Sequence, residues 1–241
     1  MIPILMYHQI GTPAPKGTPF RGLTVHPTDF KRQMTWLKRF GYTGLSMHEL
    51  MPYLRGEKTG KVVGITFDDG YQNVLQHAIP VLNALGFTST NYIVSNHFAG
   101  SNFWDHSKGI PPSALMSLEE LQQWLKSGHE IGSHTLDHVH LTEVEPSEAK
   151  HQIKQSKTQL EDALQTEVNA FCYPYGHKNT DIENWVRQSG YTNATTTARG
   201  LVLPTDDFFD LPRVTVSRST NIVRFLQKCL TQLEHKKRKP L

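Results

Sequence analysis

The sequence predicts an α/β fold, an irregular TIM-like (β/α) barrel of seven to eight parallel strands. Short β-rich runs alternate with helical segments along the chain, which is the pattern of parallel sheets with crossover helices. The length of 241 residues suits one domain with a large core. We therefore expect one domain over residues 1–234, followed by a basic tail over residues 235–241.

Helices are indicated by apolar periodicity and by their end signals. Ser46 and Glu49 form a capping-box pattern, and Gly56 follows the same segment. A glycine also follows most of the other helical segments, where it can end a helix in the left-handed conformation. The expected helices cover residues 28–40, 46–55, 73–85, 117–127, 146–164, 180–189 and 221–233.

Strands are indicated by short runs of β-branched and aromatic residues between these helices. The expected strands cover residues 3–7, 42–45, 62–67, 88–94, 130–132, 169–173, 192–196 and 213–216. The segment 95–117 has no clear periodicity and is the longest expected loop. Its Trp104, Asp105 and His106 are available to shape one wall of a cleft.

Charge and composition exclude several classes of protein. A net charge of +3 does not argue for nucleic-acid binding, and the basic run at 235–239 is typical of a solvated tail. No segment approaches the ~20 apolar residues of a membrane span. The first residues lack the basic region of a signal peptide, so we expect a cytoplasmic chain as printed, or a periplasmic or extracellular one if a leader has been trimmed. Two cysteines make no disulfide framework, and Cys172 is expected to be a buried thiol.

Two carboxylates follow the expected strand 62–67. Asp68 and Asp69 are neighbours, and neighbouring residues of an extended chain point to opposite sides. One carboxylate can therefore bind a metal ion while the other remains free as a base. An isolated Asp-Asp-Gly sequence is more often a turn, so this motif alone is weak.

Two histidines follow the expected strand 130–132. His134 and His138 are four residues apart, so both imidazoles would share one face of a helical turn and could bind one ion. Two histidines and one carboxylate make the open three-ligand site of catalytic Zn²⁺. Because both motifs follow strands of an α/β protein, where chemistry is usually placed, together they predict a hydrolytic metal site.

The motifs resemble those of the polysaccharide deacetylases with a NodB-homology domain, carbohydrate esterase family 4, and in particular the branch of poly-N-acetylglucosamine deacetylases. The resemblance implies that Asp68 is the catalytic base. It implies that Asp69, His134 and His138 bind Zn²⁺ or another divalent ion such as Co²⁺, Ni²⁺ or Fe²⁺. It also implies that the backbone N–H of Tyr175 stabilises an oxyanion. The matching segments are 3–8, 66–70, 133–138, 171–176 and 211–213.

The chain departs from the family pattern in three motifs. Of the family's Asp-x-x-Asp-Trp motif it keeps only the first Asp and the Trp, at Asp181 and Trp185. Cys172 stands where well-studied members have the arginine that orients the base, and Leu211-Pro212-Arg213 stands where a Leu-x-His supplies the general acid. We hypothesise that the guanidinium of Arg213 reaches Asp68 from the C-terminal end of a late strand, the alternative being an ordinary surface ion pair. His8, at the end of the first strand, is the first candidate for the proton donor, or else a buried structural histidine.

These features predict a metal-dependent hydrolase that removes N-acetyl groups from poly- or oligosaccharides containing N-acetylglucosamine. Three alternatives stay open: hydrolysis of another non-peptide C–N bond, hydrolysis of sugar O-acetyl esters, and an inactive carbohydrate-binding relative. The presence of both carboxylates and both histidines argues against the last, because binding a sugar does not require that set.

Overall fold

Parallel strands close into a barrel in the computed structural model, which describes residues 1–236. The barrel strands are β1 Ile4–Tyr7, β5 Val62–Phe67, β6 Thr90–Ile93, β7 Glu130–Ser133, β8 Ala170–Cys172, β9 Asn193–Arg199 and β10 Leu211–Thr215. Neighbours run in the order β1, β10, β9, β8, β7, β6, β5, and β1 pairs again with β5 to close the ring. A further parallel strand, β4 Thr43–Leu45, pairs with the first half of β5.

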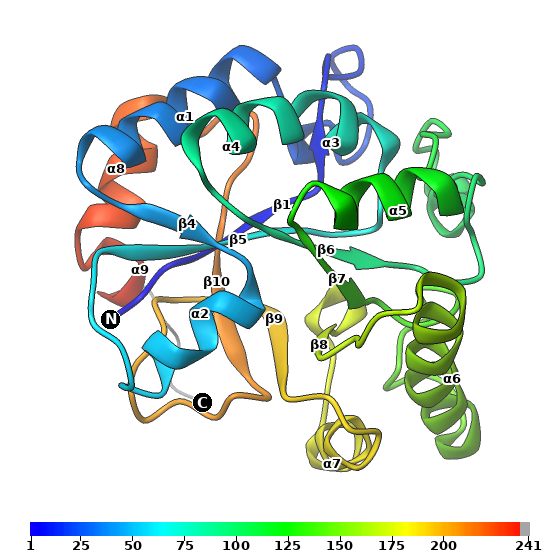
Figure 1. The fold of residues 1–241 in the computed structure, drawn as a ribbon. Coiled ribbons are helices and arrows are strands. Elements are labelled where there is room, and N and C mark those ends of the chain that lie inside the picture. The colour runs from blue at the N-terminus through cyan, green and yellow to red at the C-terminus, as the bar shows by residue number, and fades with distance from the viewer. Residues whose placement is uncertain (237–241) are drawn as a thin grey trace.

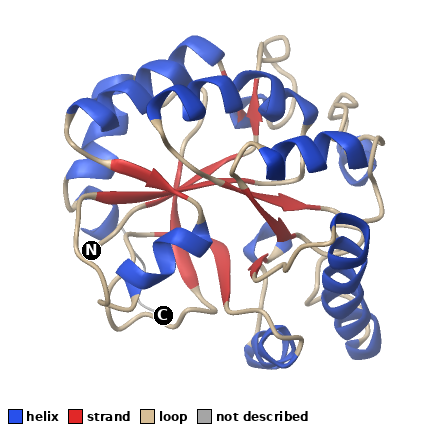
Figure 2. Cartoon of the chain, in the orientation of Figure 1, coloured by secondary structure: helices blue, strands red, loops and turns tan. Residues whose placement is uncertain are grey.

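Helices surround the strands, as the helices and strands of Figure 2 show. They are α1 Pro27–Arg39, α2 Met47–Leu54, α3 Gln72–His77, α4 Ile79–Leu85, α5 Leu118–Lys126, α6 Pro146–Leu164, α7 Thr180–Gln188, α8 Ile222–Leu230 and α9 Leu233–Lys236. Helix α1 packs between α4 and α8, and α6 packs against both α5 and α7 (Figure 1). The apolar faces of this outer layer and of the strands form the larger hydrophobic cluster.

The interior of the barrel is closed at the end where the strands begin. Leu50, Met51 and Leu54 of α2 pack on residues that open several strands, among them Ile4 of β1 and Leu211 of β10. Because these apolar side chains fill the barrel at this end, a cleft into its interior can open only at the opposite end, where the strands finish. Those ends therefore hold the site.

The predicted barrel of seven to eight parallel strands is confirmed, and the differences are local. The helix expected at 73–85 is divided into α3 and α4. Pro80 has no backbone N–H to donate, and its ring would clash with a carbonyl group of the preceding helical turn. The helix expected at 221–233 ends at Leu230, and α9 begins after the extended Thr231. A small parallel pair, β2 Gln9–Ile10 with β3 Thr24–Val25, was not expected from the sequence.

An ion pair holds the C-terminal end of the described chain against the barrel. Glu234 of α9 is fully buried and forms an ion pair with Arg199 at the end of β9. Of the basic tail expected at 235–241, residues 235 and 236 belong to α9, and residues 237–241 lie outside the described residues. Within residues 1–236, no helix is both long and apolar enough to cross a membrane.

Candidate functional site

The predicted site residues meet where the barrel strands end. His8 follows β1, Asp68 and Asp69 follow β5, His134 follows β7, and Tyr175 follows β8. All five line one pocket of about 260 Å³, together with His138. A larger hollow of about 410 Å³ elsewhere on the molecule contains none of these residues. The chemistry of the lining therefore selects the smaller pocket as the site.

Asp68 is held by a buried bidentate ion pair with Arg213. Nη1 of Arg213 lies 2.7 Å from Oδ1 of Asp68, and Nη2 lies 2.7 Å from Oδ2. Both residues are almost completely shielded from solvent. Burial alone would raise the pKa of Asp68, but the charge and hydrogen bonds of Arg213 hold it below its ordinary value. Asp68 is therefore an oriented carboxylate at neutral pH.

Arg213 contacts Asp68, as expected, but it does so from inside the barrel. The position expected for Arg213 was wrong. Arg213 lies in the middle of β10 rather than at its C-terminal end, and it is fully buried rather than part of a surface pair. Two residues not expected from the sequence accept hydrogen bonds from further donors of Arg213. The carbonyl of Thr196 accepts from Nε at 2.8 Å, and the hydroxyl of Thr66 accepts from Nη1 at 3.0 Å.

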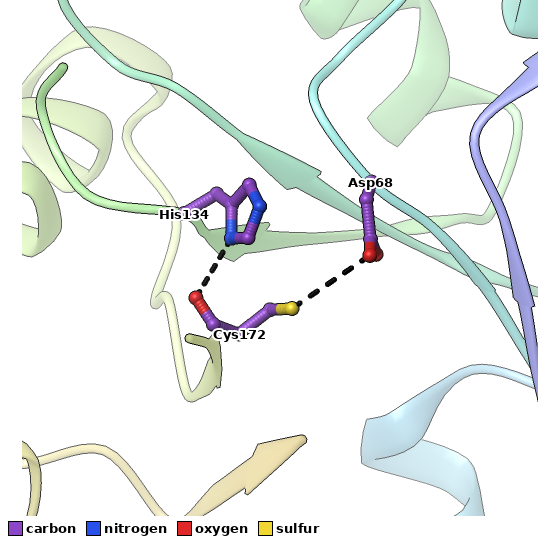
Figure 3. Close-up of side chains that lie close together, drawn as sticks. All are labelled: Asp68, His134 and Cys172. Atoms are coloured by element: carbon purple, nitrogen blue, oxygen red, sulfur yellow. Dashed lines mark hydrogen bonds between the residues drawn. The ribbon is translucent and has the colours of Figure 1, made fainter. Parts of the chain in front are cut away.

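Cys172 lies between Asp68 and His134 and contacts both (Figure 3). Its thiol is 3.8 Å from Oδ2 of Asp68 and 3.1 Å from Nη2 of Arg213, and its carbonyl oxygen is 2.7 Å from Nδ1 of His134. The thiol is buried, as expected, and burial raises its pKa. Cys172 is thus a neutral neighbour of the Asp68 pair, and its carbonyl orients a histidine.

Asp69, His134 and His138 present three ligand atoms to one point. Oδ1 of Asp69 lies 3.5 Å from Nε2 of His134 and 3.3 Å from Nε2 of His138. Ligands of a tetrahedral ion at ~2.1 Å are about 3.4 Å apart, so these separations suit one shared divalent ion. Oδ1 of Asp69 is also buried without a hydrogen-bond partner among the described residues. These three residues therefore fit a divalent metal ion and form a candidate metal site.

The protonation states of this set favour metal binding. A carbonyl can only accept, so Nδ1 of His134 carries the hydrogen that it donates to Cys172, and Nε2 keeps its lone pair toward Asp69. Burial lowers the pKa of His134 to about 4, which leaves the imidazole neutral at pH 7. Burial would raise the pKa of Asp69, but His138 and the other histidines lower it below its ordinary value.

The expected helical turn over His134 and His138 is wrong. These residues lie in the loop after β7, which turns through Thr135 and His138 in the left-handed conformation. Seven described residues other than glycine have positive φ, and Asp69, Thr135, His138 and Tyr175 are four of them. Such backbone is costly and is typical of functional sites. The hydroxyl of Thr135 accepts from the backbone N–H of His138 at 3.0 Å and stabilises the turn.

Tyr175 occupies a tight turn beside the candidate ligands. Its ring lies edge-on to His138, with ring centroids 4.6 Å apart. The hydroxyl of Thr197 donates to its carbonyl oxygen at 3.0 Å. The next residue must be glycine, because Gly176 has φ of +77° and a Cβ there would collide with Thr197. Thr197 therefore fixes the turn.

The remaining walls come from β1 and from the long loop 95–117. His8 is partly buried, and its Nε2 lies 3.9 Å from Oδ2 of Asp68. Of the three loop residues expected to shape a wall, Asp105 lines the pocket and Trp104 stacks on His138, with ring centroids 4.8 Å apart. His106 is exposed and does not belong to the pocket lining.

Comparison with known proteins assigns the family. The family model for polysaccharide deacetylases matches residues 55–194, which is more than half of the chain. The matched range includes Asp68, Asp69, His134 and His138. The chain belongs to the polysaccharide deacetylase family.

Individual relatives agree with this assignment. The poly-beta-1,6-N-acetyl-D-glucosamine N-deacetylase of Staphylococcus epidermidis is 28% identical over 207 residues, which cover 82% of this chain and 69% of that protein. The Streptococcus pyogenes deacetylase PplD, solved in complex with acetate, has a TM-score of 0.82 and 26% identity, covering 95% of this chain and 97% of that one. BC0361, a polysaccharide deacetylase from Bacillus cereus, has a TM-score of 0.79 and 27% identity, covering 94% and 68%.

The buried ion pair predicts a large, pH-dependent loss of stability for Arg213→Met. Met keeps an unbranched chain but removes the charge, and so leaves Asp68 buried and unpaired. We expect ~3–5 kcal/mol lower free energy of unfolding at pH 7, the usual cost of removing one partner of a buried pair.

The sign of the pH dependence follows from the pKa of Asp68. In the native protein this pKa is lowered, so the stabilisation is present above the unfolded pKa of about 4 and is lost as pH falls. In Arg213→Met, burial raises the pKa, so stability is lost as pH rises. The difference between the proteins in urea unfolding should therefore widen from about pH 3 to pH 7. A difference that does not change with pH would contradict this account.

Proposed function

We propose that this family member is a metal-dependent hydrolase that removes N-acetyl groups from poly- or oligosaccharides containing N-acetylglucosamine, with residues 1–234 as its catalytic domain. One observation carries the proposal: Asp69, His134 and His138 converge beside a separate carboxylate, Asp68, that Arg213 holds in place. Metal-dependent amide hydrolysis uses these two parts, an ion that activates water and an oriented base.

The substrate class is supported by the relatives and by the pocket. A relative that matches 82% of this chain is a poly-beta-1,6-N-acetyl-D-glucosamine N-deacetylase. The pocket of about 260 Å³ is lined by Phe20 and Tyr175, two aromatic residues that are not buried. Such surfaces pack well against the apolar faces of sugar rings while an acetamido group enters between them.

The ion that suits the ligand set is Zn²⁺, with Co²⁺, Ni²⁺ or Fe²⁺ as alternatives, because two imidazoles and one carboxylate are ligands that these ions accept. Asp69, His134 and His138 would hold it. When bound, the ion would lower the pKa of a water molecule and polarise the amide carbonyl.

Asp68 acts as the general base. It takes the proton from the attacking water, and its bidentate bonds to Arg213 keep the carboxylate oriented during the reaction. The lowered pKa keeps Asp68 ionised and ready to accept the proton. Cys172, a neutral thiol beside Asp68 and Arg213, adds only a long contact of 3.8 Å to Asp68, so the charged, bidentate contact comes from the guanidinium.

The other predicted site residues take the remaining steps. The backbone N–H of Tyr175 donates to the oxygen that becomes negatively charged, a kind of contact worth ~10² to 10³ in rate. His8, which lines the pocket 3.9 Å from Asp68, delivers the proton that the amine needs to leave.

Acetate release is the direct test of this proposal. The protein is incubated with β-1,6- and β-1,4-linked N-acetylglucosamine oligomers, with O-acetylated sugars and with small non-sugar amides. We expect acetate from the N-acetylated oligomers, loss of activity with a chelator, and recovery with Zn²⁺. Preference for esters or for small amides would move the function to another hydrolase class, and binding without turnover would indicate an inactive relative.

Asp68→Asn should separate the base from the metal site. Asn cannot accept the proton, so we expect turnover to fall by ~10² to 10⁴, the usual contribution of a general base. Because Asp69, His134 and His138 are intact, this buried set should still hold its one equivalent of metal. Elemental analysis and a thermal unfolding curve serve as controls, and near-normal turnover in a metal-loaded variant would assign the base to another residue.

Arg213→Lys tests orientation rather than charge. Lys keeps the positive charge but cannot donate two parallel hydrogen bonds to Asp68, so turnover should fall at least tenfold with little change in the affinity for substrate. Arg187→Lys is a matched control, because Arg187 pairs with Asp207 on the exposed surface. A fully active Arg213→Lys protein would remove the orienting role.

A further inference from the structure

We infer that a second divalent-ion site lies at the rim of the pocket and is formed by His140, Glu143 and His177. None of these residues belongs to the buried set or lines the pocket itself. Their ligand atoms lie within 4.8 Å of one another. Nδ1 of His140 is 3.2 Å from Nδ1 of His177 and 3.7 Å from Oε1 of Glu143.

The distance between the two ring nitrogens suits a shared ion. Two imidazole ligands of a tetrahedral ion, each bonded at ~2.0–2.1 Å, have nitrogens about 3.3 Å apart. The observed separation of 3.2 Å requires almost no movement. Only one hydrogen fits between the two Nδ1 atoms, so at least one of these nitrogens directs a lone pair toward the other ring. An ion between the rings would be bound by both nitrogens.

The surroundings of His140 already hold its ring in position. The ring stacks face to face on Tyr175, with centroids 3.8 Å apart and planes 5° from parallel. The backbone N–H of Glu143 donates to the carbonyl of His140 at 2.8 Å, which closes a turn between these two ligands. The Glu143 side chain is 67% exposed, so it can move the few tenths of an ångström that an ion would require.

The ligand types define the class of ion. Two imidazoles and a carboxylate favour Zn²⁺, Ni²⁺ or Cu²⁺ over Mg²⁺ and Ca²⁺, which prefer oxygen ligands. The site is more exposed than the buried set and its third ligand is free to move, so its affinity should be lower. It therefore fills after Asp69, His134 and His138 are occupied.

An ion bound by His140, Glu143 and His177 would restrict the movement of the pocket wall. His140 follows β7 and His177 follows β8, so an ion would join the two loops that carry the candidate ligands and Tyr175. Because His140 stacks on Tyr175, which lines the pocket, fixing His140 also restricts the movement of that wall. The concentration of free ion would then influence how polymer enters the site.

Calorimetric titration of the metal-free protein with Zn²⁺ tests the site directly. The native chain should bind two equivalents, one tightly and one more weakly. His177→Ala and His140→Ala should each lose the weaker equivalent, whereas His151→Ala, which changes an exposed histidine outside the cluster, should still bind two. Two variants at different ligands guard against a folding defect in either one, and circular dichroism checks their folds.

The same titration separates the two sites. Asp69→Asn should lose the tight equivalent and keep the weak one, so a failure of the buried site and a failure of the rim site give different results. The inference is overturned if the native chain binds a single equivalent, in which case the two histidines only share a hydrogen bond. It is also overturned if both His140→Ala and His177→Ala still bind two equivalents.

Discussion

The arrangement of the site depends on the buried ion pair between Arg213 and Asp68. Removing two charges from water costs several kcal/mol per ion, and only good geometry with satisfied donors offsets it. Here Thr66 and the carbonyl of Thr196 take donors of Arg213 that Asp68 does not. Because well-packed apolar residues can often replace such a pair without loss of stability, we interpret its value as fixing a carboxylate in the barrel rather than as strengthening the fold.

The ion pair also distinguishes two carboxylates that are neighbours in the chain. Both oxygens of Asp68 face the guanidinium, whereas Oδ1 of Asp69 faces two imidazole nitrogens and has no hydrogen bond. The left-handed backbone of Asp69 turns its side chain away from the barrel interior toward the loop after β7. The proposed roles of base and ligand therefore follow from position relative to one cation, since the two side chains are chemically identical.

The sequence was sufficient for the features that depend on local patterns. The β-rich runs, and the glycines that follow the helical segments, predicted the barrel. The position of both motifs after strands predicted that Asp68, Asp69, His134 and His138 lie together at one end of it. The conformation of the histidine loop was not predictable, because a spacing of four fits both a helical turn and a loop with left-handed residues. The direction of Arg213 was equally hidden, since charged side chains are usually exposed and no local signal identifies Asp68, which is distant in sequence, as a buried partner. The contact of His134 with the Cys172 carbonyl joins residues far apart in sequence, and no local signal reports it.

Tyr175 connects the inner and outer parts of the site through direct contacts. Its ring lies edge-on to His138 on one side and face to face with His140 on the other. The two histidines are only two residues apart, yet the left-handed backbone at His138 turns one toward Asp69 and leaves the other at the rim. Trp104 stacks on His138 from the long loop 95–117, so His138 is packed between aromatic rings from two different segments. A ligand histidine confined in this way has little rotamer freedom to lose when it binds an ion, and such preorganisation favours both affinity and a fixed geometry.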